Sequence, residues 1–464
     1  MKTTAIVIGA GISGLSAAYG LQKKGFDVSV LEPDQDVGGA LKTVQRDGYL
    51  AERGPNSMQI TSPEMAYLLG ELGLRTHIVT PQPGATKRFL VKHSQLLAAP
   101  MGPIDFLKTP LLSPRAKFKL MCEPWIKKTR DADDASLAHF TARRLGHEVL
   151  DYAVNPMISG IYAGKPEALS TKHALPKLWD MEQQHGSLLK GALAIRKQKR
   201  QQGQVPFKPF LASFKHGMHT LAHAFQQKLG DAVQLNAAVT QIAFDAHADQ
   251  PWIVHWHEND TEHKATSAYL ILALPAHAIP ALPLPASIRD TLYDLPEIPY
   301  PALASLVLGF KRDHIQHPLN GFGMLIPEKE HKNILGVLFS SSLFGGRAPE
   351  GHHTLTVFMG GARQETLAGL PQAELLDLAL KDLNRLLGLS GKPTFIEHTF
   401  WKHAIPQYNL GYGRFVEMME RAESRFSGLK IIGNHRGGIS VGNCLMNGLA
   451  LADALTDEEH VSAG

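Results

Sequence analysis

The fold is decided by residues 4–14, which read TAIVIGAGISG. The apolar run at the start of this stretch is typical of a buried parallel strand that stops at a glycine. Helical spacing follows as far as Lys24, and residues 26–31 predict a second strand that ends at Glu32. A strand, a glycine-rich turn, a helix and a second strand in this order predict a βαβ unit that binds a dinucleotide.

Each glycine of the turn has a physical task. Gly9 permits the tight turn, Gly11 lets the backbone approach a pyrophosphate, and Gly14 lets the helix pack closely on the strand. The pyrophosphate would sit on the helix N-terminus, and Glu32 would accept hydrogen bonds from the ribose hydroxyls. The cofactor contacts expected from this unit are Gly9, Ala10, Gly11, Ile12, Ser13, Gly14, Glu32 and Pro33.

A glycine pair follows the second strand and continues as Gly38-Gly39-Ala40. A pair at this place resembles the FAD-dependent amine oxidase and desaturase superfamily, in which the loop runs beside the cofactor. The resemblance favours FAD over NAD and implies contacts at Gly39 and Ala40. An arginine often follows the pair in that superfamily, whereas Leu41 follows Ala40 here. An arginine contact to the phosphates is therefore missing or comes from elsewhere.

The C-terminal part of the chain supports a flavin independently. Residues 429–434 predict a buried strand that runs into a glycine-rich loop, and residues 439–455 predict a helix with small residues on one side. In the superfamily this helix N-terminus points at the flavin, where its dipole and N–H groups stabilise negative charge on the ring. An ordinary glycine-rich turn is the alternative. The resemblance implies contacts at Gly433, Asn434 (often Asp in the superfamily), Ile439, Ser440 and Val441.

No second glycine signature follows a strand, so a pyridine nucleotide site has no support. We therefore expect the cofactor to be FAD, held non-covalently, and the electrons to leave to oxygen or another small acceptor.

The two ends of the chain predict one discontinuous cofactor domain, because both would contact the same flavin. Residues 237–242 predict a strand that belongs to it, with Val239 placed to meet the adenine. We expect an α/β plus α+β fold in three parts: a Rossmann-like FAD-binding domain (1–80, 210–275 and 400–464), a mixed-sheet substrate domain (81–99 and 276–399) and a helical, membrane-associating domain (100–209).

Length, charge, cysteine content and hydropathy indicate the class of protein and its place in the cell. The chain has 464 residues and a net charge of +4, and its two cysteines, Cys122 and Cys444, predict neither a disulfide framework nor a metal site. The sequence shows no signal peptide and no uncharged apolar stretch of about 18 residues, so we expect a cytoplasmic protein.

Local charge is more informative than the total. Residues 101–130 and 186–215 each contain seven Lys and Arg residues beside apolar clusters. Such stretches are either solvated helix faces or a surface that lies on anionic lipid at the inner face of a membrane. Nucleic acid is not expected, because no binding motif accompanies the charge.

Seven short motifs then follow one another along the chain: ERGPNS (52–57), KRFL (87–90), SGIYAG (159–164), KLW (177–179), GFGML (321–325), SSSLF (340–344) and GNHRGG (433–438). In this order they resemble the oxygen-dependent protoporphyrinogen oxidases of haem and chlorophyll synthesis, over nearly the whole chain. Their details are closer to the plant-type enzymes than to the coproporphyrinogen-oxidising branch of Gram-positive bacteria.

The resemblance implies roles for several side chains. Arg88 stands where the family pairs a substrate propionate, a task that suits a bidentate guanidinium. Leu325 and Phe344 fall where side chains sandwich the pyrrole rings, and Gly160 falls where the backbone approaches the substrate. Without the resemblance these positions would indicate a surface arginine, core side chains and a loop glycine. The further flavin contacts expected are Gly54, Pro55, Asn56, Ser57 and Trp401.

The reaction implied by the resemblance converts protoporphyrinogen IX to protoporphyrin IX in three two-electron flavin turnovers, each reducing oxygen to hydrogen peroxide. A hydride leaves a methylene bridge for flavin N5, so the protein mainly positions the substrate and excludes water, and we assign no acid or base. A homodimer and a hand-over of product to a ferrochelatase are compatible with this function. The alternatives are a coproporphyrinogen III oxidase, an amine oxidase in which Trp401 faces the flavin, and a flavin-binding assembly partner without turnover.

Overall fold

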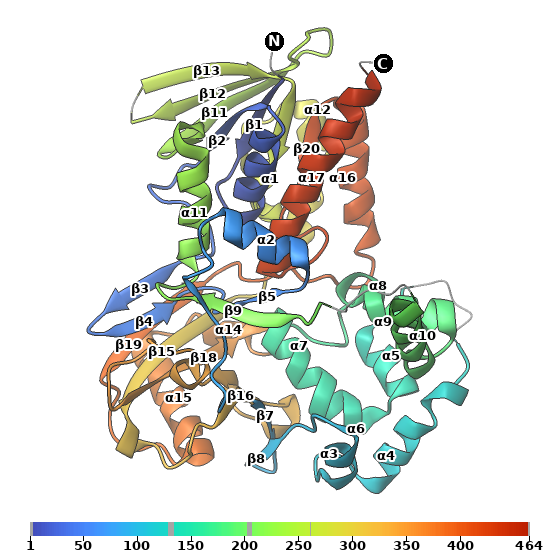
Figure 1. Cartoon of the computed structure of the whole chain (residues 1–464), viewed down its shortest axis with the longest axis vertical. Coiled ribbons are helices and arrows are strands. Elements are labelled where there is room, and N and C mark those ends of the chain that lie inside the picture. The colour runs from blue at the N-terminus through green and yellow to red at the C-terminus, as the bar shows by residue number, and fades with distance from the viewer. Residues whose placement is uncertain (1–2, 129–133, 202–206, 260, 463–464) are drawn as a thin grey trace.

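The computed structural model describes residues 3–128, 134–201, 207–259 and 261–462 (Figure 1). A five-stranded sheet of order β10-β2-β1-β14-β20 lies beside both ends of the chain, and all of its strand pairs are parallel. The strands expected at the apolar run of residues 4–14, at 26–31 and at 429–434 are confirmed. Their bounds and those of their partners are β1 Thr4–Ile8, β2 Asp27–Leu31, β10 Val233–Gln234, β14 Tyr269–Leu272 and β20 Leu429–Ile431.

Burial on both faces explains the apolar composition of this sheet. Val7 pairs with Val30 on one side and Ile271 on the other, and all three side chains are fully buried. A parallel strand covered on both faces needs apolar residues at successive positions, without polar alternation. One face packs against four helices: α1 Ile12–Lys23, α2 Pro63–Glu71, α11 His219–Leu229 and α17 Val441–Ser462 (Figure 1).

The other face of the parallel sheet is covered by a three-stranded antiparallel sheet and two helices. Trp252 is fully buried there, and its indole Nε1 donates to the Ser427 carbonyl oxygen at 2.9 Å. The strand predicted at 237–242 is confirmed as β11. The elements of this layer are β11 Ala237–Phe244, β12 Trp252–Glu258, β13 Thr261–Ser267, α12 Ala286–Thr291 and α16 Gly413–Arg425.

Small residues let α17 lie directly on α1. A Cβ placed on Gly448 would lie 2.1 Å from Ser16 Oγ, and one placed on Gly20 would lie 2.7 Å from Ala452 Cβ. The small side of the predicted C-terminal helix is thus its contact with α1. This helix begins at Val441 and not at residue 439. Ser440 caps its N-terminus, because the Ser440 Oγ accepts from the Asn443 N–H at 3.1 Å.

A seven-stranded mixed sheet forms a separate layer in the lower part of Figure 1. Its order is β19-β15-β18-β17-β16-β7-β8, and only β16 and β7 run parallel. Leu306, Leu308 and Val357 form its core under α15. The bounds are β7 Lys87–Lys92, β8 Gln95–Ala98, β15 Leu303–Lys311, β16 Gly321–Leu325, β17 Ile334–Leu338, β18 His352–Gly360, β19 Phe395–Trp401, α13 Ser340–Leu343, α14 Glu365–Ala368 and α15 Gln372–Leu387.

Two small sheets lie between the parallel sheet and the mixed sheet (Figure 1). One is a hairpin of β3 and β4, and the other is an antiparallel set in which β9 pairs with both β5 and β6. The second of these sheets joins segments that are far apart in sequence. Their bounds are β3 Thr43–Arg46, β4 Tyr49–Glu52, β5 Met58–Ile60, β6 Ile78–Val79 and β9 Phe210–Phe214.

The predicted helical stretch at 100–209 is largely helical in the part that the structure describes, and it forms the lower right of Figure 1. No helix among residues 3–128, 134–201, 207–259 and 261–462 is long and apolar enough to cross a bilayer. The helices are α3 Pro103–Lys108, α4 Pro114–Met121, α5 Leu137–Arg144, α6 His147–Val149, a π-helical turn Leu150–Val154, α7 Asn155–Tyr162, α8 Thr171–Ala174, α9 Pro176–His185 and α10 Leu188–Gln201.

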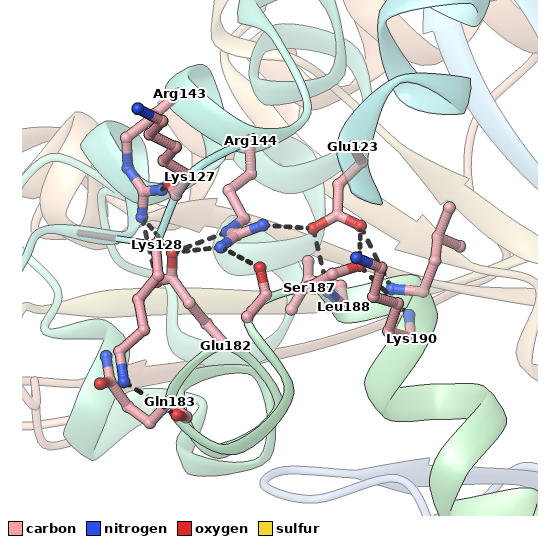
Figure 2. Close-up of polar contacts among 12 residues, drawn as sticks. Glu123, Lys127, Lys128, Arg143, Arg144, Glu182, Gln183, Ser187, Leu188 and Lys190 are labelled. Carbon is pink, nitrogen blue, oxygen red and sulfur yellow. Dashed lines mark hydrogen bonds and ion pairs between the residues drawn. The ribbon is translucent and has the colours of Figure 1, made fainter. Parts of the chain in front are cut away.

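A buried charge network holds these helices together (Figure 2). Arg144 on α5 is fully buried, and its guanidinium lies between Glu123 at 2.6 Å and Glu182 at 2.7 Å. Glu123 also accepts from the Ser187 hydroxyl at 2.6 Å and from the Leu188 N–H at 2.9 Å. One carboxylate therefore fixes the start of α10 to the rest of the helical stretch.

Candidate active site

The glycine turn between β1 and α1 is sterically closed on one side and open on the other. A Cβ on Gly14 would lie 2.0 Å from the Gly9 carbonyl oxygen, so only glycine fits there. Gly9 itself has φ +104°, which favours glycine. A Cβ on Gly11, in contrast, would meet no atom within 4 Å. The backbone of Gly11 therefore borders free space at the N-terminus of α1, as a pyrophosphate cradle requires.

Glu32, at the end of β2, holds the glycine turn by accepting hydrogen bonds. Its Oε2 accepts from the Ala10 N–H at 2.7 Å and its Oε1 accepts from the Asp34 N–H at 3.2 Å. Burial raises the pKa of the Glu32 carboxyl, against these two hydrogen bonds, which lower it. Each carboxylate oxygen keeps further acceptor capacity. Glu32 thus stabilises the turn itself, and its ribose contact stays a prediction.

The start of β11 is tied to the same end of β2. The Ala237 N–H donates to the Glu32 carbonyl oxygen at 2.8 Å, and the Asn236 N–H donates to the Asp34 carbonyl oxygen at 3.1 Å. Val239 follows at an irregularity in the β11–β12 pairing. The exposed Pro33 lies in the linking turn. The structure therefore brings Val239 and Pro33 to the region of Glu32, and their contacts with an adenosine stay a prediction.

The glycine pair Gly38-Gly39 lies directly on the glycine turn between β1 and α1. The Gly38 N–H donates to the Ala10 carbonyl oxygen at 2.8 Å, and a Cβ on Gly39 would lie 3.4 Å from the Gly11 Cα. Gly39 and Ala40 are both exposed. The pair is therefore part of the rim around Gly11.

The segment 54–57 continues this rim. A Cβ on Gly54 would lie 2.0 Å from the Ala40 carbonyl oxygen. The Asn56 amide donates to the Gly54 carbonyl oxygen at 3.2 Å, and Trp401 Nε1 donates to the Arg53 carbonyl oxygen at 2.8 Å. Gly54, Pro55, Asn56 and Ser57 are all partly exposed. The structure thus brings Trp401 and the segment 54–57 next to Gly39-Ala40.

The loop before α17 is held by Tyr408, which sequence reasoning missed. Its hydroxyl donates to the Asn434 carbonyl oxygen at 2.7 Å and accepts from the Gly438 N–H at 3.1 Å. The body of α17 lies against the first turn of α1, since a Cβ on Gly448 would be 2.6 Å from the Ser13 carbonyl oxygen. No sequence motif marks a buried tyrosine of this kind.

The residues expected at a substrate lie on the mixed sheet and on α7. A Cβ on Gly160 would lie 2.6 Å from Leu325 Cδ2, so α7 and β16 touch at these two positions. Arg88 pairs with Gly323 in the parallel β7–β16 register, and Leu90 pairs with Leu325. Because side chains alternate along a strand, Arg88 and Leu325 lie on the same face of the sheet.

Arg88 is exposed, and within the described chain it has no ion-pair partner. Its guanidinium lies 5.4 Å from the centroid of the Phe322 ring. An exposed cation on an aromatic ring is available to an anionic ligand.

Phe344 differs from the expectation. Its side chain is 1% exposed and packs against Ala85 and Leu343. The structure therefore does not present Phe344 beside Leu325 as an open wall, because the segment around Ala85 covers it. Its contact with a substrate ring stays a prediction.

Near Phe344 the structure also contains a buried pair of an acidic and a basic side chain, which the sequence analysis did not predict. Glu52, at the end of β4, and Arg347 are 3% and 2% exposed, and Arg347 Nη2 lies 3.9 Å from Glu52 Oε1. Glu52 directly precedes the segment 54–57. A charged residue at the end of the apolar run 49–51 is the only local signal, and it does not identify the partner.

These features can now be compared with known proteins. A family profile described as flavin containing amine oxidoreductase matches residues 12–456. The chain belongs to this family. It is 34% identical to protoporphyrinogen oxidase 2, chloroplastic/mitochondrial, of Arabidopsis thaliana, over 96% of this chain and 92% of that one. It is 27% identical to coproporphyrinogen III oxidase of Bacillus subtilis (strain 168), over 98% of each.

A solved structure of putrescine oxidase matches with a TM-score of 0.67 at 18% identity, over 98% of this chain and 99% of that one, and shares the fold. The resemblance to protoporphyrinogen oxidases is thus confirmed by the plant relative, and the protein is a flavin-dependent oxidoreductase. The open space at Gly11, beside the N-terminus of α1, fits the phosphate part of such a cofactor.

The cradle at Gly11 makes a prediction about cofactor affinity. Gly11 has φ −68° and ψ 171°, which alanine adopts readily, so Gly11→Ala should fold normally while its methyl group occupies the cradle. We expect FAD affinity to fall about tenfold or more, or about 1.4 kcal/mol, measured by flavin fluorescence titration of the apoprotein.

Gly84→Ala is the matched control, because a Cβ there also meets nothing within 4 Å. It should leave both FAD affinity and the unfolding temperature unchanged. Parental FAD affinity in Gly11→Ala would place the cofactor elsewhere.

Proposed function

We propose that this protein binds FAD non-covalently in a Rossmann-like domain and oxidises protoporphyrinogen IX to protoporphyrin IX in haem synthesis. The observation that carries the proposal is Arg88, an exposed cation on the sheet face that it shares with Leu325, which in turn touches Gly160. The near full-length similarity to a plant protoporphyrinogen oxidase supports it.

The residues that would hold FAD come from three parts of the chain. Gly11 would border the pyrophosphate, Glu32 would meet the ribose, and Val239 would meet the adenine. The segments 54–57 and 439–441 would lie at the flavin end. Bound FAD supplies a two-electron acceptor. The N–H groups at the start of α17 would then stabilise negative charge on it.

The proposed substrate is a large apolar macrocycle with two propionates. Such a molecule needs aliphatic walls and a cation at the mouth of its site, which Leu325 and Arg88 offer on one face of the sheet. A guanidinium binds a carboxylate through two parallel hydrogen bonds and so also orients the ring. The protein would act by holding a methylene bridge in place and excluding water, without an acid or base of its own. Oxygen is the acceptor we propose for each of three two-electron steps, with hydrogen peroxide as product.

The choice of substrate can be tested directly. Without oxygen, protoporphyrinogen IX should bleach the flavin absorption of the purified protein, and air should restore it with formation of peroxide. Coproporphyrinogen III is the comparison, because the Bacillus subtilis relative carries that name. Faster reduction by coproporphyrinogen would assign that substrate instead, and no reduction by either porphyrinogen would refute the proposal.

The role of Arg88 can be tested by removing its charge. Arg88→Ala should raise the KM for protoporphyrinogen about 10- to 100-fold, because a charge-assisted hydrogen bond is worth about 1.5–3 kcal/mol, and should leave FAD affinity unchanged. Lys87→Ala is the matched control, since Lys87 is also exposed but points to the opposite side of the strand. Steady-state kinetics decide, and equal KM values in the two variants would remove Arg88 from the site.

We also infer that the helical stretch rests on anionic lipid. Several large apolar side chains are more than half exposed there: Met101, Ile104, Leu107, Phe118, Met121, Trp125 and Leu193. Six residues, with Leu107 among them, line an open groove of about 430 Å³. Lys117 lies beside this surface, since its Nζ donates to the Leu107 carbonyl oxygen at 2.8 Å. The seven Lys and Arg residues of 101–130 favour negatively charged headgroups over a neutral partner. In the same helical stretch, Glu123 anchors the start of α10 (Figure 2).

This surface predicts binding to vesicles. The protein should sediment with phosphatidylserine-containing vesicles more than with phosphatidylcholine vesicles, and less at high salt. Trp125→Ser and Leu107→Ser, whose side chains are 78% and 62% exposed, should each weaken binding about tenfold. Tyr293→Ser, at an exposed position elsewhere, is the control. Absence of binding at low salt would favour solvated helix faces.

A further inference from the structure

The buried pair of Glu52 and Arg347 lies between two segments that the reaction needs. Glu52 precedes the segment 54–57, and Arg347 follows Phe344 in the chain. The Arg347 guanidinium lies 5.6 Å from the centroid of the Phe344 ring. The pair therefore joins the segment 54–57 to the segment that contains Phe344.

Glu52 is held from two directions. Its carboxylate accepts from Thr43 Oγ1 at 2.6 Å and from the Met218 N–H at 2.9 Å. Thr43 lies on β3, and Met218 lies just before α11, so one side chain connects the β3–β4 hairpin to a helix of the parallel sheet. A carboxylate with two donors and a nearby cation is fixed in position.

Arg347 is held from the opposite side. Its Nη2 donates to Ser213 Oγ at 2.7 Å and to the Phe214 carbonyl oxygen at 3.2 Å, both on β9. Its own carbonyl oxygen accepts from the Leu50 N–H at 3.2 Å. Its Nη1 is fully buried and has no hydrogen-bond partner in the described chain. A buried cationic N–H without a partner is costly, which points to a water molecule or other acceptor beside it.

A small cavity of about 10 Å³ lies between the two charged groups. Glu52, Arg347, Asn56 and Phe344 all line it. Its polar lining continues through Thr356, whose hydroxyl lies 3.5 Å from Asn56 Oδ1. A cavity of this size is close to the volume that one water molecule needs, and its polar groups supply the partners.

We propose that Glu52 and Arg347 are positioning residues for the reaction, which hold the segment 54–57 and the Phe344 segment at a fixed separation around one buried water. The proposal rests on the proposed function, because it takes the first segment as a flavin contact and the second as a substrate contact. The pair itself touches neither ligand. Its effect passes through Asn56 on one side and Phe344 on the other.

The test removes the charges singly and together in the full-length flavoprotein. Arg347→Met or Glu52→Gln alone leaves one buried charge without its partner, which destabilises the fold. The double variant removes both charges at once and should fold and retain FAD. A failure of the single variants to fold therefore does not hide a loss of positioning.

In the double variant we expect the visible absorption and circular dichroism of the flavin to change. Single-turnover reduction by protoporphyrinogen should slow about 10- to 100-fold, the effect of a small misplacement. Arg347→Lys, which keeps the charge, should restore part of the rate. A double variant with the parental flavin spectrum and reduction rate would overturn the proposal.

Arg144→Met is the matched control, since Arg144 is an equally buried arginine in the helical stretch. It should lower the unfolding temperature and leave the flavin spectrum unchanged; a changed spectrum would show that such a shift is not specific to Arg347. If neither porphyrinogen reduces the parent protein, the proposed function fails, while the flavin spectra still test the positioning of Asn56 without any substrate.

Titration of Glu52 gives a second readout. Burial raises the pKa of its carboxyl from 4.5 to about 7, and the charged group that faces it in the described chain is Arg347, beside Thr43 and the Met218 N–H. The stability from the protonated acid is complete below pH 4.5 and is lost as the pH rises through 7. The unfolding temperature of the parent should fall over this window. Glu52→Gln should remove that part of the slope, and an equal slope in both proteins would contradict a buried, coupled acid.

Discussion

The structure depends on one steric constraint, the contact between the first strand and the first helix. A Cβ on Gly14 would lie 2.0 Å from the Gly9 carbonyl oxygen, so α1 can approach β1 this closely only through glycine. The position of α1 then fixes α17, which lies on it through Gly448. The N-terminus of α1 borders the free space beside Gly11. The flavin proposal and the rim formed by Gly39 and Gly54 follow from that arrangement.

How far the sequence predicts this protein depends on whether a feature is local. The turn from Gly9 to Glu32 is predictable because its determinants lie in one short stretch and each has a steric or hydrogen-bonding task. The family resemblance implied a substrate contact for Gly160 and for Leu325 separately, but their contact with each other was not predictable, since α7 and β16 are distant in sequence. The burial of Phe344 was not predictable, because its cover comes from the segment around Ala85.

Two buried arginines illustrate what sequence patterns leave out. Arg144 and Arg347 are both almost inaccessible to solvent, and each is paired with an acid that also accepts a backbone N–H elsewhere. Breaking such a pair costs about 3–5 kcal/mol, whereas replacing it by apolar residues is often neutral. The pairs therefore determine which segments meet more than they add net stability. No periodicity in the sequence encodes a partner of that kind.

The strand order of the parallel sheet has a consequence for folding during synthesis on the ribosome. β1 and β2 are made first, but β14 separates β1 from β20, and β20 is made only at residues 429–431. The sheet cannot close until almost the whole chain has been synthesised, and its pairings have a high contact order, which slows folding. Until then β14 lacks its neighbour β20, and such an unpaired strand edge is prone to aggregate. The sheet that contains the early βαβ segment therefore stays incomplete until translation is almost finished.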